Sequence, residues 1–312
     1  MKLIRGIHNL QARHHGCVLT IGNFDGFHRG HQALIAQLQS EGRRRGLPVM
    51  VMIFEPQPQE HFAGRDAPAR LTRLRDKVKY LAQAGVDIVL CVKFDQRFAA
   101  IDAQTFVETL LVAKLGVKFL CVGDDFRFGA WRLGDFALLQ QMKTAAGFDV
   151  MSTATYTESG HRISSTAVRE ALGADQLAAA ELLLGHPYRI SGRVEHGDEL
   201  GRTLGFPTAN VSLKKRPAPI NGVYAVYVFG LGSQPLPGVA NIGARPTVAG
   251  LVPRLEVHLL DVTMDLYGRH IEVVIRAKLR NEQRFASLDE LKRQIANDAA
   301  TGRKFFGLPA PL

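Results

Sequence analysis

The chain has 312 residues, of which 46% are hydrophobic and 22% charged, and a formal net charge of +10. This length favours two domains over one core, and no apolar run approaches the ~20 residues of a membrane-spanning helix. The first six residues lack the apolar segment of a secretory signal. We therefore expect a cytoplasmic protein without a membrane partner.

Three cysteines, Cys17, Cys91 and Cys121, lie in separate apolar runs without metal-ligand spacing, which predicts buried free thiols. The net charge is compatible with nucleic acid or with anionic small molecules. The chain shows no RNA-recognition or helix-turn-helix signature and has a single tryptophan, Trp131. Nucleotide phosphates therefore explain the charge as well as a polymer does, and we expect no nucleic-acid partner.

In the first half, short apolar runs alternate with helix-length amphipathic segments. Strands are predicted at Cys17–Ile21, Val49–Phe54, Ile88–Val92, Phe119–Val122 and Phe148–Met151, and helices at Gln32–Arg45, Arg73–Ala84, Ala103–Lys114 and Phe136–Ala146. This alternation predicts βαβ units around a parallel sheet, an α/β fold of Rossmann-like type. Ligands of such sheets bind beyond the carboxyl ends of the strands.

Two loops follow strands and should meet at that edge of the sheet. Residues 22–31 combine three glycines with His28 and His31 ahead of a predicted helix. Glycines let backbone N–H groups approach a ligand, and a helix start offers free N–H groups to an anion. Histidines there can donate to phosphate oxygens. The loop after the fourth strand adds Asp125 and Arg127, so the sequence predicts a phosphate site at this edge.

A third segment carries Ser164, Ser165 and Thr166, with Arg169 one turn later. Hydroxyls at a helix start suit phosphate, although a plain helix cap is the commoner use of such residues. The next predicted helix ends at Gly185. We therefore predict domains at residues 1–185 and 186–312.

The second half has the pattern of an antiparallel barrel. Strands are predicted at Tyr188–Val194, Gly222–Phe229, Pro237–Ile242, Leu255–Leu260 and Ile271–Leu279, followed by a helix at Leu288–Ala300. Apolar and aromatic residues alternate with turn residues, which predicts a mainly-β domain with a closed barrel of the six-stranded type and a terminal helix packed across it.

The first half contains neither a P-loop nor a dinucleotide-binding Gly-x-Gly-x-x-Gly. It also offers no obvious nucleophile or metal cage. Catalysis would then depend on orientation and charge stabilisation, as in phosphoryl-type transfers.

Two motifs resemble those of the α/β nucleotidyltransferases. Residues 22–31 read Gly-Asn-Phe-Asp-Gly-Phe-His-Arg-Gly-His, and residues 163–169 read Ile-Ser-Ser-Thr-Ala-Val-Arg. The resemblance implies attack of a phosphate monoester on the α-phosphate of ATP, with His28 and His31 holding the triphosphate and stabilising the transition state. It implies further ATP contacts for Gly22, Asn23, Phe24, Asp25, Ser164, Ser165, Thr166 and Arg169.

Residues 201–210, Gly-Arg-Thr-Leu-Gly-Phe-Pro-Thr-Ala-Asn, are similar to the signature of riboflavin kinases, and residues 238–247, 255–261, 265–268 and 279–282 are similar to their later motifs. With the first-half motifs, the whole chain resembles the bacterial bifunctional riboflavin kinase and FAD synthetase family. This implies phosphorylation of riboflavin to FMN by the second domain and adenylyl transfer to FMN by the first.

The resemblance also implies roles for single residues. Glu256 would be the general base for the ribityl hydroxyl, and the hard oxygens of Thr208 and Asn210 suit Mg²⁺ on the ATP phosphates. ATP-binding residues of the kinase would be Gly192, Gly197, Gly201, Arg202, Pro207, Thr208 and Asn210, its flavin contacts Asn241 and Arg280, and the FMN or nucleotide loop of the first domain Asp125, Arg127 and Arg132. The glycines would let a loop fold over the phosphates.

Two other functions are compatible with parts of the sequence. The first domain could transfer a cytidylyl group or use another acceptor, or the basic chain could bind nucleic acid and use flavin as a signal. The riboflavin kinase signature argues against the first, and the lack of base-reading motifs against the second. A weak or transient homo-oligomer is left open.

Overall fold

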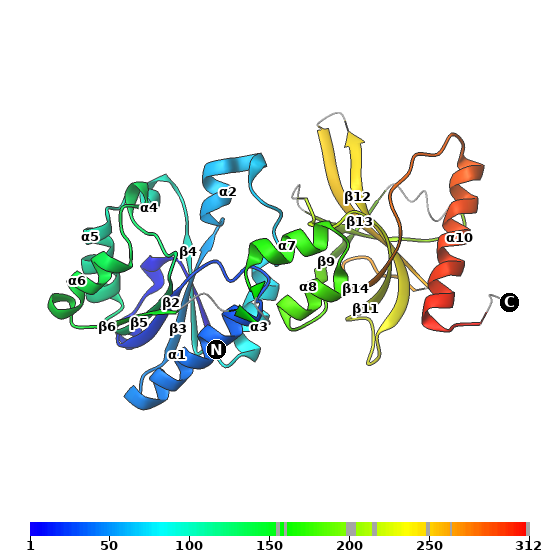
Figure 1. Ribbon diagram of the computed structural model, residues 1–312. Coiled ribbons are helices and arrows are strands. Elements are labelled where there is room, and N and C mark those ends of the chain that lie inside the picture. Colours follow the sequence, from blue (N-terminus) through cyan, green and yellow to red (C-terminus); the bar gives the residue numbers. More distant parts are fainter. Residues whose placement is uncertain are drawn as a thin grey trace. The chain divides into compact units, whose positions relative to one another are not determined.

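We describe a computed structural model of residues 1–153, 157–158, 161–197, 204–213, 217–247, 250–262 and 264–309 (Figure 1). The chain forms two compact units. The sheet unit comprises residues 1–68 and 72–164, and the barrel unit comprises residues 69–71 and 165–312. The predicted domain boundary at Gly185 stays a prediction.

The sheet unit is built on six parallel strands in the order β1-β4-β3-β2-β5-β6, which confirms the predicted α/β fold. The strands are β1 (Lys2–Arg5), β2 (Cys17–Ile21), β3 (Val49–Glu55), β4 (Ile88–Lys93), β5 (Val117–Gly123) and β6 (Asp149–Thr153). The sequence did not predict β1. Only Ile4 of its four residues is buried, so it carries no apolar run.

The helices of this unit are α1 (Arg29–Arg45), α2 (Pro58–Ala63), α3 (Leu74–Gln83), α4 (Gln96–Ala99), α5 (Ala103–Thr105) and α6 (Phe136–Ala146). The predicted helix 103–114 is interrupted, because α5 continues as a π-helix, η4 (Phe106–Lys114). Shorter elements are the 3-10 turns η1 (Ile7–Asn9), η2 (Ala12–His14), η3 (Gly64–Asp66) and η5 (Ala130–Arg132), and the hairpin strands β7 (Thr157–Glu158) and β8 (His161–Arg162).

Both faces of the sheet are covered by helices. Val18 and Val51 belong to a core cluster with residues of α1 and α3, whereas Leu19 and Met50 belong to a cluster with residues of η4 and α6. Successive residues of a strand point to opposite faces, so strands buried on both sides read as continuous apolar runs. This is why most of the strands were visible in the sequence.

The strand order places a topological switch point between β2 and β5. The chain runs from β2 through β3 to β4 on one side, and from β5 to β6 on the other. Loops at such a point diverge and leave a crevice beyond the carboxyl ends of the strands. The loops that begin after Ile21 and Gly123 leave the sheet there.

The barrel unit is a closed barrel in the order β10-β13-β12-β11-β14-β9, with antiparallel pairing throughout, as predicted. Its strands are β9 (Arg189–Glu195), β10 (Ala209–Ser212), β11 (Gly222–Phe229), β12 (Leu236–Thr247), β13 (Gly250–Leu259) and β14 (His270–Arg280), and its helices are α7 (Ser165–Gly173), α8 (Leu177–Leu184) and α10 (Leu288–Phe306). The sequence did not predict the four-residue β10.

The helices of this unit pack on the barrel in two groups. Leu172 of α7 and Leu184 of α8 belong to the same core cluster as the inward-facing barrel residues. On the outside, Val223 and Val239 pack with Phe306 of α10. The predicted terminal helix therefore packs across the barrel, as expected.

Candidate active sites

The loop after β2 has a constrained backbone. Phe24 and Phe27 have φ angles of 49° and 46°, in the left-handed region that non-glycine residues seldom adopt. Asp25 holds this shape, because its Oδ1 accepts hydrogen bonds from Thr72 N (2.9 Å) and Thr72 Oγ1 (3.1 Å), and Thr72 Oγ1 accepts one from Gly26 N. At 2% exposure, Asp25 is placed as an anchor of the loop.

His28 and His31 form a stacked pair at the start of α1. Their ring centroids are 3.6 Å apart with an interplanar angle of 20°. His28 caps the helix, since its Nδ1 accepts a long hydrogen bond of 3.4 Å from His31 N. An accepting Nδ1 leaves Nε2 of a neutral His28 as the N–H donor. This tautomer suits donation to a phosphate oxygen.

Burial is the largest cause that lowers the pKa of His31 well below its usual range, followed by the charges of His28 and Lys77. Among the described residues, neither Nδ1 of His31 nor Oδ1 of Asn23 has a hydrogen-bond partner, although both atoms are buried. A buried polar atom without a partner costs about 1–3 kcal/mol. Such atoms beside a strained loop are typical of a site that a ligand completes.

A side chain at position 30 would crowd the histidine pair. A Cβ atom there would lie 3.2 Å from the ring of His28 and 3.5 Å from the carbonyl of Ile163. The first residue of the 163–169 motif therefore lies beside the His-x-Gly-His loop. The sequence could not show this contact, because the two segments are 133 residues apart (163 − 30).

The loop after β5 brings the second predicted group to the switch point. Asp125 pairs with Arg162 at 3.2 Å, and both side chains are exposed. Arg127 and Arg132 are also exposed. Trp131 and Arg132 have φ angles of 57° and 60°, so this loop is strained as well. The sequence prediction did not include Arg162.

The residues of the hydroxyl segment lie at the start of α7. Ser164 and Ser165 are half-buried and Thr166 is exposed. The guanidinium of Arg169 donates from Nε to the carbonyl of Ala69 at 2.6 Å. This contact fixes one side of the Arg169 guanidinium within the barrel unit.

In the barrel unit, the strand register aligns three predicted residues. Asn210 of β10 pairs with Glu256 of β13, which pairs with Asn241 of β12. Directly paired residues of antiparallel strands share a face, with Cβ atoms about 5 Å apart. The flanking Leu255 and Val257 are buried, so the row faces outward. Two amides therefore flank one carboxylate.

Pro207 and Thr208, which precede β10, lie beside β13. His258, two residues after Glu256, is 3.0 Å from the carbonyl of Pro207 through Nδ1 and lies edge-on to Phe206. Since Ala209 pairs with Val257, the antiparallel register carries Thr208 toward His258. The Thr208 hydroxyl and the Asn210 amide thus lie on the face that carries Glu256.

The glycines predicted to cover the phosphates have different positions. Gly197 lies against Asn210, since a Cβ at 197 would be 2.4 Å from Asn210 Nδ2. Gly192 lies within β9, as the predicted strand 188–194 implied, and pairs with Ile271, so it is not part of a loop over the phosphates. Gly201 and Arg202 lie outside the described residues.

Arg280 makes a bidentate ion pair with Asp298 of α10, at 2.8 and 2.7 Å. Its remaining nitrogen, NH1, donates to the carbonyl of Asn281. Arg280 follows the outward row through its pairing with Val223. In this structure its guanidinium binds the terminal helix.

The donor chemistry fits a magnesium ion carried by ATP. Thr208, Asn210 and Glu256 offer hard oxygens on one face, and Mg²⁺ commonly takes one or two protein ligands with waters and phosphates completing its shell. Among the described residues, no group of three or more His, Cys, Asp or Glu side chains could hold a metal. The fit is to a metal that arrives with the nucleotide.

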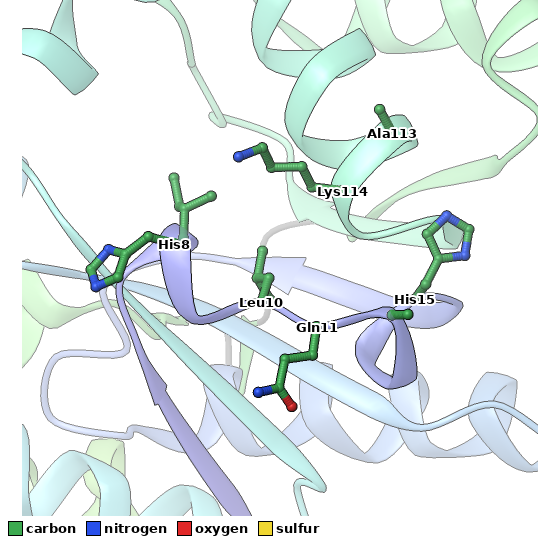
Figure 2. Close-up of a pocket in the computed structure, with 8 residues that line it drawn as sticks. His8, Leu10, Gln11, His15, Ala113 and Lys114 are labelled. Atoms are coloured by element: carbon green, nitrogen blue, oxygen red, sulfur yellow. The ribbon is translucent and has the colours of Figure 1, made fainter.

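A groove of about 600 Å³ lies away from the predicted sites. Figure 2 shows His8, Gln11 and His15 around it, with Lys114 on the opposite wall. The lining residues come from the segment between β1 and β2 and from the end of η4 before β5. None of the predicted site residues lines this groove.

The comparisons with known proteins match both parts of the chain to families of known function. A family model for FAD synthetase matches residues 10–167, and one for riboflavin kinase matches residues 184–306. The bifunctional riboflavin kinase/FMN adenylyltransferase of Escherichia coli (strain K12) is 70% identical over 312 residues, covering all of both chains. This chain belongs to that family.

The bifunctional riboflavin kinase/FMN adenylyltransferase family includes further relatives of this chain. That of Haemophilus influenzae is 52% identical over 306 residues, covering 98% of this chain and 99% of the relative. A crystal structure described as the macrolide-efflux protein from Streptococcus pneumoniae has a TM-score of 0.80 at 28% identity, covering 96% of this chain and 98% of that one. Among the described residues, no helix is long and apolar enough to cross a membrane.

Family membership confirms the predicted function. The chain is a bifunctional enzyme with a FAD synthetase in its N-terminal part and a riboflavin kinase in its C-terminal part. ATP, riboflavin and FMN are the substrates that these activities imply. Residues 168–183 lie between the two family matches.

Proposed function

We propose that riboflavin phosphorylation takes place on the outer face of the barrel, at the Asn210–Glu256–Asn241 row. The register of β10, β13 and β12 carries this proposal, because it places a carboxylate between two amides. Glu256 takes the proton of the ribityl 5′-hydroxyl as its oxygen attacks the γ-phosphorus of ATP, and ADP leaves. Thr208 and Asn210 hold the Mg²⁺ that arrives with ATP.

Adenylyl transfer is assigned to the switch point of the sheet unit. A phosphate oxygen of FMN attacks the α-phosphorus of ATP, and pyrophosphate leaves. His28 and His31 donate to phosphate oxygens as charge develops, and Asn23 orients the nucleotide with its buried amide oxygen. The hydroxyl segment, Ser164–Arg169, holds the leaving phosphates, and the loop of Asp125, Arg127 and Arg132 receives FMN.

The two assignments are tested by a reciprocal pair of variants. We expect Glu256→Gln to abolish FMN formation from riboflavin and to leave adenylylation of added FMN within about twofold of wild type, since the carboxylate serves only the kinase. We expect His31→Gln to do the reverse. Products are separated by chromatography after incubation with ATP and Mg²⁺. Loss of both activities in either variant would contradict separate sites.

The same assay distinguishes other nucleotide donors. Replacing ATP with CTP should give no dinucleotide product from FMN. A gel-shift assay with duplex DNA and RNA tests the nucleic-acid alternative, which predicts salt-sensitive binding. We propose a cytoplasmic enzyme, supported by three buried free cysteines.

A further inference from the structure

Lys77 is a buried lysine that none of the sequence motifs includes. It lies in α3, its side chain is 0% exposed, and its Nζ atom is buried. Lysine is seldom fully buried, because removing an ammonium group from water is costly. A fully buried lysine is therefore a candidate for a functional role through the effect of its charge on a neighbouring group.

Contacts at both ends of this segment fix α3 against the His-x-Gly-His loop. Tyr80, three residues after Lys77, stacks on Phe27 with centroids 5.7 Å apart and an interplanar angle of 5°. The Phe27 ring lies 6.5 Å from that of His31. Before the helix, Thr72 binds Asp25 of the same loop. Residues three apart share a helix face, so Lys77 lies on the face that Tyr80 turns toward the loop.

The electrostatics agree with this placement. Burial has the largest effect in lowering the pKa of His31, and the charges of His28 and Lys77 lower it further. The ammonium group of Lys77 is therefore near enough to disfavour a second positive charge on His31. The loop and the helices α1 and α3 carry these other charged residues: Asp25, Arg29, Glu41, Arg43, Arg44, Arg45, Arg75, Asp76 and Lys79.

We propose that Lys77 is a positioning residue for adenylyl transfer, whose buried ammonium group supplies the fixed positive charge behind the His28–His31 pair where the triphosphate of ATP binds. The inference depends on the proposed role of these histidines. One fixed cation with two neutral N–H donors attracts a triphosphate without the mutual repulsion that stacked imidazolium rings would have. Because the ammonium charge is shielded from water, its field at the histidines is stronger than that of a surface lysine.

The kinetic test uses three variants of the full-length enzyme. Lys77→Met removes the charge at similar length, Lys77→Arg keeps it, and Lys79→Met removes an exposed lysine from the same helix. We expect Lys77→Met to lower kcat/KM of FMN adenylylation by about 10- to 100-fold, Lys77→Arg to recover most of it, and Lys79→Met to stay within about twofold. Riboflavin phosphorylation by the same preparations should not change.

The second readout is the titration of His31 by NMR in histidine-labelled protein, with the resonance identified by its loss in His31→Gln. In the wild-type enzyme His31 should stay neutral below the usual pKa of about 6.5. In Lys77→Met its pKa should rise, because one charge that disfavours the imidazolium is gone, yet stay below the usual value because burial and His28 remain. Lys77→Arg should leave it low.

Each other outcome overturns the proposal. Unchanged adenylylation or an unchanged His31 titration in Lys77→Met would show that the charge does not act on the histidine pair. Unfolding of the sheet unit in both Lys77 variants, seen by near-ultraviolet circular dichroism, would make Lys77 a structural residue. If instead His31→Gln keeps full adenylylation, the role of the histidines fails, and the titration alone still decides whether Lys77 acts on His31.

Discussion

At the residue scale, the kinase site depends on a missing side chain. A Cβ atom at Gly197 would lie 2.4 Å from Nδ2 and 2.6 Å from Cγ of Asn210. Real Cβ atoms do not approach so closely, so the amide of Asn210 has its place beside Glu256 only because position 197 is glycine. The sequence identified Gly197 as a loop residue but not its partner.

Gly197→Ala should displace the Asn210 amide and lower kcat/KM of riboflavin phosphorylation about tenfold or more, since small displacements at a reacting centre are costly. FMN adenylylation by the same preparation should be unaffected. Gly232→Ala is the control, because a Cβ at 232 meets nothing within 4 Å. Wild-type phosphorylation in Gly197→Ala would show that the amide tolerates the displacement.

At the scale of elements, the terminal helix is attached to the barrel by the ion pairs Arg280–Asp298 and Arg303–Asp261 as well as by apolar contacts. Arg280 ends β14, and Asp298 lies in the middle of α10. Their side chains are 20% and 8% exposed. Gln294 also donates to Asp298 at 2.9 Å. The flavin contact that the resemblance implies for Arg280 stays a prediction, whereas its pairing with Asp298 could not be predicted, because the pattern of a helix does not show which carboxylate faces the barrel.

Asp298→Asn should leave the half-buried guanidinium of Arg280 without a carboxylate and destabilise the barrel unit by about 2–4 kcal/mol. The free energy of unfolding is measured by chemical denaturation, with circular dichroism and the loss of kinase activity as two probes of unfolding. Asp289→Asn, in the exposed first turn of α10, should cost no more than about 1 kcal/mol through the helix dipole. Equal stabilities of the two variants would show that the ion pair contributes little.

At the scale of the whole molecule, α7 and α8 belong structurally with the barrel. Val168, Leu172, Ala180 and Leu184 share its core cluster. The hydroxyl of Tyr224, a fully buried barrel residue, donates to Asp175 between the two helices at 3.1 Å. Burial and the charge of Asp175 raise the pKa of this phenol above its ordinary value, so Tyr224 stays protonated and keeps the donor.

A fragment of residues 165–312 should therefore unfold at a higher temperature than one of residues 186–312, which exposes the apolar surface that the two helices cover. Each buried leucine contributes about 1.5–3 kcal/mol, so the shift should be several degrees or more. Calorimetry on the two fragments, with riboflavin phosphorylation as the activity check, makes the comparison. Equal midpoints would place the structural boundary at Gly185, where the sequence predicted the domain boundary.

Much of the fold could be read from the sequence because its signals are local. Runs such as Cys17–Ile21 predicted strands at their observed bounds, since both faces of the sheet are buried. The strands of the main sheet and the barrel that were missed, β1 and β10, have four residues each and are too short for a period to show. For this reason β10, the strand that carries Asn210, was not predicted.

By itself, the sequence indicated the two activities, because its contiguous motifs resemble those of known families, and their residue types suit phosphate binding and proton transfer. Only the tertiary structure decided which distant residues meet. The register of three strands aligns Asn210, Glu256 and Asn241, the switch point brings together the loops after β2 and β5, and α3 packs through Tyr80 against the loop that carries the histidines. These contacts depend on strand order and on packing summed over each core, which no local pattern encodes.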